Sequence, residues 1–505
     1  MSSRYGPSGA GKDINPKQIV LAGGYLLAAV LMIGAILFFI APPLVHPFVL
    51  LVYARWPSWF IFGLFVAGIV LALFGRRRLG VSMVGVFGLF WLATVVFGSA
   101  WQHLSYLNHT NLQRLGAEPE TTGIRYLPLE VANTASTNKN TDPTVTPGGV
   151  EPLVEGDDAR WLAAREPNNF YQKYFGNQPG VLLINTTADV ETDSTEFNPG
   201  YGLCCFSNRL GWSAVKEHFW ADYSPEDYPY LLDGEIVIVK PYLTYYFDFP
   251  VMVPQYGGVL IFHHDGSVED LTPDEAASKY PEGRFFPHEM ASYFARSYQY
   301  KDGIINAWFY HRDMPDVPHL DAQNQFPFLI PTDQGPQWYT AVEPYGVGKS
   351  AYKAYYQNAT TGEVGVYDFP EPLVGPDRAE SFASNAFQQL KNAYFIEPRP
   401  VVQDGKLYWM LSATTSSYPD VNFTALVDAY SEDVYKLDNR DAVERFVAGE
   451  DPGKVGQKVT TSSSTTTSSS ETTAKSTTSQ QGRPSDEELI QMLRDAADRL
   501  EQEQK

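Results

Sequence analysis

Cysteine is nearly absent from this sequence: its 505 residues include two, adjacent at Cys204 and Cys205. Neighbouring thiols cannot join distant parts of the chain, so a scaffold held together by disulfides is excluded. No Cys-x-x-Cys motif accompanies them, which argues against a redox site. We therefore interpret both cysteines as small, buried apolar residues.

Positive charge is scarce beyond the first quarter of the chain. Residues 1–117 contain eight lysines and arginines and one acidic residue, whereas the rest of the chain contains 29 basic and 57 acidic residues. An acidic surface of this size repels phosphate backbones, so we expect no nucleic-acid partner. The same charge keeps a large domain soluble.

Asp, Glu, Lys, Arg and His are missing from three long apolar runs, residues 19–40, 57–75 and 80–101. Each run is long enough to cross a bilayer core of about 30 Å as a helix. We predict three transmembrane helices, of which the first is an uncleaved signal anchor. Without charged residues, these helices alone do not suit a transporter or pump. The apolar segment 44–56 is too short to span and predicts an interfacial or re-entrant piece.

The basic residues near these runs predict the orientation of the chain. Arg4, Lys12 and Lys17 lie in the N-terminal tail, residues 1–18, and Arg76–Arg78 joins the second run to the third. Basic flanks of membrane spans stay in the cytoplasm. We therefore predict an integral, multi-pass protein of the cell membrane with a cytoplasmic N-terminus and everything beyond the third run outside.

Signatures of catalysis and of nucleotide binding are lacking as well. Residues 6–12 and 343–350 imitate a phosphate-binding loop, but Asp13 replaces the hydroxyl residue in the first and Glu343 replaces the first glycine in the second. No Gly-x-Ser-x-Gly elbow and no His-Glu-x-x-His motif occurs. We expect no nucleotide and no cofactor, and the sequence leaves an enzymatic role open while favouring a non-catalytic one.

One loop gathers two histidines and three aspartates within eleven residues. Imidazole and carboxylate groups are ligands for zinc or calcium, and the prolines among them would fix the loop. This loop is the best candidate for a metal site and, in an enzyme, for the active site. The candidate ligands are His311, Asp313, Asp316, His319 and Asp321.

Composition divides the chain beyond the spans. Residues 102–150 end in a run rich in Asn, Thr and Pro and predict a stalk or linker. Residues 151–450 alternate β-branched and aromatic runs with helix-prone segments, which predicts an α+β domain with a mixed sheet. One of its helices begins after Thr272, a helix cap followed by proline. The Ser/Thr-rich residues 451–483 predict a disordered tether, and residues 484–505 predict an amphipathic docking helix.

Two stretches of the predicted domain are alike. Trp338 opens a strand that leads to a hairpin at Thr361–Val364, and Trp409 opens another strand that leads to a similar hairpin. This pattern resembles PepSY-type repeats over residues 336–440, or 255–440 when a looser third copy is included. The resemblance implies a binding or inhibitory module on an envelope protein, and it carries over no catalytic residue.

Four Asn-x-Ser/Thr sequons follow the last predicted span. Such sequons are acceptors of N-linked glycans on the outer side of a membrane, which accords with the predicted orientation. The candidate acceptors are Asn108, Asn185, Asn358 and Asn422.

These features favour a membrane-anchored extracytoplasmic interaction or accessory protein of the cell envelope, with a scaffold or regulatory role and no catalysis. One alternative is a hydrolase of an envelope polymer or peptide, with a metal or carboxylate site. Another is an auxiliary subunit of a larger membrane complex. In each case we expect a protein partner, bound through the transmembrane helices or through the C-terminal helix.

Overall fold

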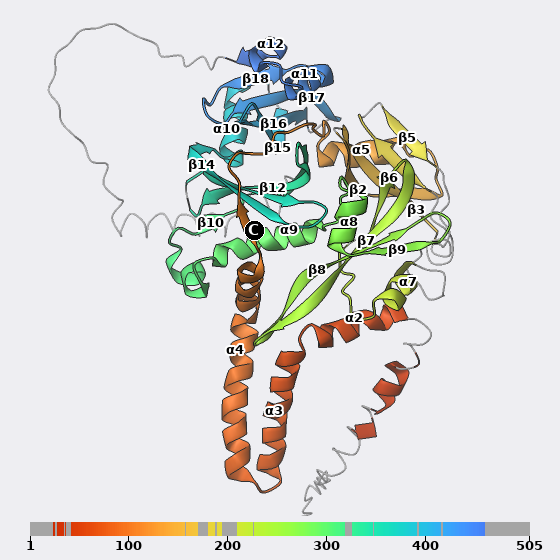
Figure 1. Cartoon of the computed structure of the whole chain (residues 1–505), viewed down its shortest axis with the longest axis vertical. Coiled ribbons are helices and arrows are strands. Elements are labelled where there is room, and N and C mark those ends of the chain that lie inside the picture. The colour runs from red at the N-terminus through yellow and green to blue at the C-terminus, as the bar shows by residue number, and fades with distance from the viewer. Residues whose placement is uncertain are drawn as a thin grey trace, which may run out of the picture. The chain divides into compact units, whose positions relative to one another are not determined.

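The computed structural model in Figure 1 describes residues 24–25, 28–34, 36, 42–156, 158–169, 180–186, 189–193, 210–225, 227–318, 326–346, 348–390, 393–415 and 418–459. Several sequence predictions fall outside these ranges. They concern most of the first predicted span (residues 19–40), the adjacent Cys204 and Cys205, His319, Asp321, most of the tether and the C-terminal helix.

The described chain is a mixed α+β structure with two apolar helices near the N-terminus and a large β-rich domain. The helices α3 (Trp56–Leu73) and α4 (Arg77–His109) are long and apolar enough to cross a membrane, and they match the second and third predicted spans. They lie side by side (Figure 1). A Cβ on Gly80 would lie 2.4 Å from the backbone nitrogen of Ala72, so glycine permits this close packing.

The helix α2 (Pro42–Tyr53) occupies the segment predicted as interfacial or re-entrant. Its 12 residues are too few to cross a bilayer. The Nε2 atom of His46 lies 2.9 Å from the carbonyl oxygen of Phe219, and the ring of Tyr53 lies 5.1 Å from that of Trp220. This helix therefore packs against the β-rich domain next to the start of α3 (Figure 1).

The β-rich domain repeats one arrangement four times, with four antiparallel strands in chain order followed by a short helix. The first unit consists of β2 (Val145–Glu155), β3 (Asp158–Pro167), β4 (Val181–Ile184), β5 (Val190–Asp193) and α7 (Leu210–Glu217). The second consists of β6 (Tyr228–Leu232), β7 (Glu235–Asp248), β8 (Val251–Phe262), β9 (Val268–Leu271) and α8 (Pro273–Lys279). The third consists of β11 (Phe328–Thr332), β12 (Gly335–Pro344), β13 (Ser350–Asn358), β14 (Val364–Val374) and α10 (Pro376–Ala386). The fourth consists of β15 (Ala393–Gln403), β16 (Lys406–Thr415), β17 (Tyr418–Asp428), β18 (Val434–Leu437) and α11 (Arg440–Val447).

Tight turns set the register of these sheets. Asp233-Gly234 joins β6 to β7 and Asp404-Gly405 joins β15 to β16, with positive φ at both residues of each turn. Asp-Gly pairs adopt this backbone readily, and its twist matches that of the flanking strands. Three short strands extend the third and fourth sheets: β1 (Leu112–Arg114), β10 (Pro315–Asp316) and β19 (Gln457–Val459).

The segment predicted as a stalk, residues 102–150, is instead part of the domain. The last turns of α4 bury Tyr106 and Leu107 in the domain core, β1 pairs with β14, and α5 (Leu129–Lys139) packs Val131 and Ala132 against the first sheet. The packing face of α5 consists mainly of valine and alanine, so the helix does not stand out in a polar segment. The large domain thus begins within α4, without an intervening linker.

The remaining helices agree largely with the sequence. Thr272 caps α8 as predicted, and the structure adds a capping box between Thr272 and Glu275. Between the second and third units lie α9 (His288–Ser297), the 3-10 turn η1 (Tyr298–Tyr300) and the π-helix η2 (Asn306–Tyr310). Residues predicted as the start of the tether form α12 (Pro452–Val455) and β19.

Candidate functional site

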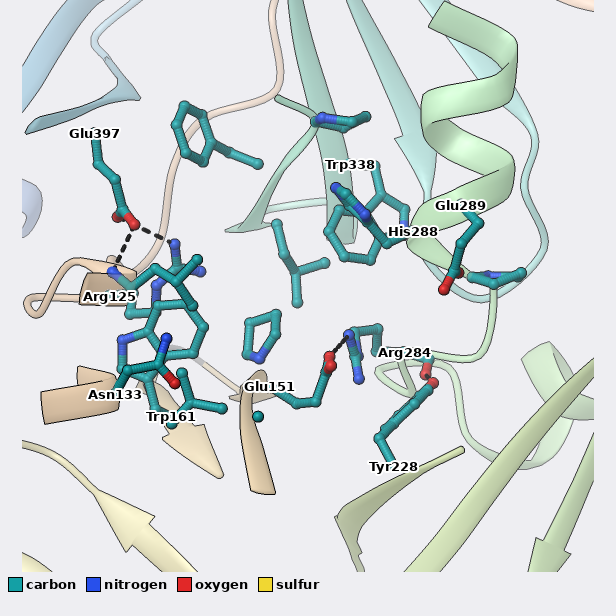
Figure 2. Close-up of a pocket in the computed structure, with 18 residues that line it drawn as sticks. Arg125, Asn133, Glu151, Trp161, Tyr228, Arg284, His288, Glu289, Trp338 and Glu397 are labelled. Atoms are coloured by element: carbon teal, nitrogen blue, oxygen red, sulfur yellow. Dashed lines mark hydrogen bonds and ion pairs between the residues drawn. The ribbon is translucent and has the colours of Figure 1, made fainter. Parts of the chain in front are cut away.

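A cavity of about 360 Å³ lies where strands of all four units meet, and we call it the inter-sheet cavity (Figure 2). Its walls come from β2, β3, β6, β11, β12 and β15, from α5 and from the segment that leads into α9. Pockets at the junctions between folded units are common ligand sites. The polar and aromatic residues around it are Arg125, Asn133, Glu151, Trp161, Tyr228, Arg284, His288, Glu289, Trp338 and Glu397.

A buried ion pair forms one side of this cavity. Arg125 Nη2 lies 3.5 Å from Glu397 Oε2, and Glu397 Oε1 accepts a hydrogen bond of 2.6 Å from the backbone N–H of Leu129. Arg399, which is 2% exposed, lies 4.0 Å from the same carboxylate and donates to the carbonyl oxygen of Arg125 at 2.6 Å. Burial lowers the pKa of Arg399 to about 10, although Glu397 opposes the shift.

The backbone of β15 is distorted where it supplies this carboxylate. Glu397 has a φ of 51°, and the pairing register between β15 and β16 shifts between Ile396 and Arg399. An irregularity of this kind redirects a side chain and is frequent beside functional sites. Here it turns Glu397 toward the arginines.

Arg284 forms the other side of the inter-sheet cavity (Figure 2). Its side chain is buried, its Nη1 lies 2.9 Å from Glu151 Oε2, and its guanidinium lies 3.7 Å from the ring centroid of Tyr228. Its Nε and Nη2 atoms are buried and have no hydrogen-bond partner among the described residues. Unsatisfied donors on a buried cation are costly, so they mark a place where a ligand or water completes the structure.

Two tryptophans stiffen the walls. The indole N–H of Trp161 donates to the carbonyl oxygen of Leu127 at 2.9 Å, and that of Trp338 donates to the carbonyl oxygen of Phe286 at 3.0 Å. The guanidinium of Arg125 lies 4.0 Å from the ring centroid of Trp161, a cation–π contact. These bonds fix the aromatic faces before any ligand arrives.

His288 adds a neutral polar group at the start of α9. Its ring lies 5.1 Å from that of Trp338. Burial lowers the pKa of His288 to about 4, and the charge of Arg284 contributes to the shift. At neutral pH this imidazole is uncharged and can donate or accept a hydrogen bond.

The arrangement suits recognition of a small polar molecule. Glu397 and Glu151 already have arginine partners, so the unused hydrogen-bonding capacity on the described walls includes the donors of Arg284. A planar guanidinium binds a carboxylate through two parallel hydrogen bonds, and rigid indole faces shelter the apolar part of a ligand.

The predicted metal loop does not contribute to this cavity. The ring of His311 stacks on Tyr345 with centroids 4.6 Å apart, and Asp316 pairs with Glu343 between β10 and β12. Within the described ranges, no group of three or more His, Cys, Asp or Glu side chains could hold a metal ion. The metal site stays a prediction, because His319 and Asp321 lie outside those ranges.

A carboxylate cluster beside that loop was not foreseen from the sequence. Lys349 Nζ lies 3.5 Å from Glu343 and 2.7 Å from Asp377. Burial raises the pKa of Glu343 to about 7, with a further contribution from the charge of Asp377. This cluster lies outside the inter-sheet cavity.

The four sequons differ in accessibility. Asn108 and Asn422 are exposed. The amide of Asn185 donates to Asp189 Oδ2 at 3.1 Å, and Asn358 Oδ1 accepts from the backbone N–H groups of the two residues that begin at Thr360, at 2.8 and 2.9 Å. Asn108 and Asn422 are therefore the better placed acceptors, and glycosylation of all four stays a prediction.

Sequence reasoning missed the arginines and glutamates of the inter-sheet cavity. A signal was present, since Glu397 and Arg399 interrupt a run rich in β-branched and apolar residues. Charges within such a run predict paired, buried groups, but the sequence does not name the partner. The chain matches no family model, and a search of curated proteins returns no match.

Proposed function

We propose that this protein is a membrane-anchored, extracytoplasmic binding protein of the cell envelope, which holds a small carboxylate in the inter-sheet cavity. The observation that supports this most directly is Arg284, a buried guanidinium whose Nε and Nη2 atoms have no partner among the described residues. Glu151 already offsets the charge of Arg284, and a carboxylate would supply both missing acceptors. The role is accessory: capture of a ligand next to the membrane, without chemistry on it.

The proposed topology has three spans, with residues 19–40 ahead of α3 and α4. The N-terminal tail and Arg76–Arg78 lie in the cytoplasm, and the large domain lies outside, because basic flanks resist transfer across the membrane. In this proposal the units of residues 336–440, or 255–440 with the looser third copy, are PepSY-like, and the resemblance favours binding over catalysis. A protein partner would contact the outer face of the spans or the C-terminal helix.

A titration of the full-length chain in mild detergent tests the carboxylate site. The probes are acetate, succinate and glutamate, with inorganic phosphate as a second anion, and the readout is the thermal unfolding midpoint. A ligand that binds the folded state alone raises this midpoint in a saturable way. We expect at least one carboxylate to do so.

Substitutions of the arginine make the test specific. Arg284→Gln should abolish the response, whereas Arg284→Lys should weaken binding about tenfold, since lysine keeps the charge but loses the planar fork. Arg378→Gln is the matched control, because Arg378 is an exposed arginine paired with Glu432 at 2.8 Å. The proposal fails if no carboxylate raises the midpoint, or if Arg284→Gln responds like the unchanged chain.

A further inference from the structure

A second and larger cavity, of about 950 Å³, lies where the apolar helices meet the domain, and we call it the junction cavity. It is lined by α2, by the domain-facing ends of α3 and α4, by α7, by α9 and by the β7–β8 hairpin.

One part of the junction cavity is apolar and continues onto the surface of the helices. Leu50 and Leu51 of α2 line it together with Val95 and Gly98 of α4. Leu51 is 47% exposed and Val95 is 57% exposed. For a chain anchored by α3 and α4, this surface faces acyl chains, so the apolar part of the cavity is open to the bilayer.

The other part of the junction cavity is polar. Arg55, the residue before α3, is exposed and forms no ion pair within the described ranges. The hydroxyl of Tyr245 donates to Asp222 Oδ2 at 2.5 Å. Burial and the charge of Asp222 raise the pKa of Tyr245, whereas the charge of Arg55 lowers it. A negative and a positive side chain thus both act on this phenol.

The lining carries both signs of charge. Lys240 Nζ lies 3.1 Å from Asp227, so this cation is already paired. Arg55 is an exposed cation of the lining, and Asp222 and Glu289 are carboxylates of the same lining. A purely anionic headgroup would be repelled by the carboxylates, whereas a headgroup with a phosphate and an ammonium group matches both signs.

We propose that the junction cavity binds one zwitterionic phospholipid with a primary ammonium headgroup, taken from the outer leaflet. Its phosphate lies at Arg55, its ammonium group lies at Asp222, and an acyl chain lies between α2 and α4. This inference rests on the proposed membrane topology and not on the carboxylate site, since the two cavities share only Glu289 among their lining residues. The lipid would fill the space between the spans and the domain and so hold α2 in place.

Lipid retention by the full-length chain tests this site. The chain is purified in mild detergent, incubated with vesicles of equimolar phosphatidylethanolamine and phosphatidylglycerol, purified again and analysed by native mass spectrometry. We expect about one phosphatidylethanolamine per chain, in clear excess over phosphatidylglycerol. Arg55→Gln should lower the retained lipid at least fivefold, and Asp222→Asn should remove the preference for phosphatidylethanolamine.

Further variants separate the tail from the headgroup. Leu51→Trp places a bulky ring in the apolar part and should lower retention, and its exposed position makes misfolding a small concern. Arg312→Gln, an exposed arginine outside the junction cavity, should retain lipid normally. Inorganic phosphate and glycerophosphoethanolamine, which lack acyl chains, should not displace the lipid at millimolar concentration.

The proposal is overturned if no phospholipid is retained, if Arg55→Gln and Leu51→Trp both retain as much as the unchanged chain, or if the tail-free compounds compete fully. Arg284→Gln distinguishes the two cavities. This variant should lose the response to carboxylates and keep the lipid, whereas Arg55→Gln should show the reverse.

Discussion

The inter-sheet cavity and the junction cavity hold their charges in different ways. In the first, Arg284 and Glu397 are each 2% exposed and are fixed by ion pairs, and Glu397 also accepts a backbone hydrogen bond. In the second, Arg55 is exposed and Asp222 is half-buried. A buried charge without its partner is far more costly than an exposed one. The charged residues of the inter-sheet cavity are therefore needed for a stable fold, whereas the exposed Arg55 of the junction cavity is not.

This difference predicts how each cavity responds to substitution. Changes in the walls of the inter-sheet cavity should lower the stability of the domain as well as ligand binding. A change at the exposed Arg55 of the junction cavity should alter lipid binding and leave the free energy of unfolding nearly unchanged. The predictions below test this contrast in order of expected size.

Glu397→Gln should have the largest effect. It removes the carboxylate that pairs with the buried Arg125 and Arg399. Removing one partner of a buried ion pair lowers the free energy of unfolding by about 3–5 kcal/mol. Denaturant unfolding of the full-length chain measures the loss. If Glu397→Gln costs less than about 1 kcal/mol, the buried-pair account of this cavity is wrong.

Glu118 is a buried carboxylate outside both cavities, and its described partner is a tyrosine instead of an arginine. Glu118 Oε1 accepts a hydrogen bond of 2.8 Å from the hydroxyl of Tyr356, and burial raises the pKa of Glu118 from 4.5 to about 7. Below pH 4.5 the group is protonated in both states and has no effect. As the pH rises to about 7, the unfolded chain releases this proton before the folded chain does. The free energy of unfolding should therefore fall by up to about 3 kcal/mol by pH 8.

Unfolding of the chain at pH 5 and at pH 8 measures this loss. Glu118→Gln keeps a neutral acceptor for Tyr356 and should reduce the pH dependence. Glu363→Gln, at an exposed position, serves as the control and should leave it unchanged. An identical pH dependence in the two variants would contradict the assignment to Glu118.

Three tryptophans at related places in their sheets separate stability from binding. Trp161, Trp338 and Trp409 each lie in the second strand of a unit, and each donates its indole N–H to a carbonyl oxygen outside that strand. Replacing each one by Phe leaves the carbonyl unpaired and should cost roughly 1–3 kcal/mol in every case. Trp161 and Trp338 line the inter-sheet cavity. Carboxylate binding should therefore be weaker in Trp161→Phe and Trp338→Phe and unchanged in Trp409→Phe.

The smallest expected effect on stability is at the junction cavity. Arg55→Gln removes an exposed charge that has no ion-pair partner in the described part of the chain, so the free energy of unfolding in detergent should change by less than about 0.5 kcal/mol. The same denaturant experiment as for Glu397→Gln applies. A loss of several kcal/mol would mean that Arg55 supports the fold, and the contrast between the cavities would disappear.

Local features of the sequence predicted local structure well. The second and third apolar runs became α3 and α4, and the helix predicted to begin after Thr272 is α8. The fold class, α+β with a β-rich domain, followed from the same signals. Prediction was wrong where the signal was weak, as in α5, whose small side chains gave no clear periodicity in a polar segment. In the first unit, β2 was missed because it begins within residues 102–150, which the sequence predicted as a stalk.

The sequence by itself determined where the chain is apolar enough to cross a membrane, which segments form hairpins and that the large domain is acidic, because these properties depend on composition and on neighbouring residues. The tertiary structure alone decided which charges meet. Arg125 and Glu397 are 272 residues apart in the chain and come together because separate sheets pack around one cavity. Periodicity and propensity act over a few residues, whereas a buried ion pair depends on how whole units pack, and no local pattern encodes that.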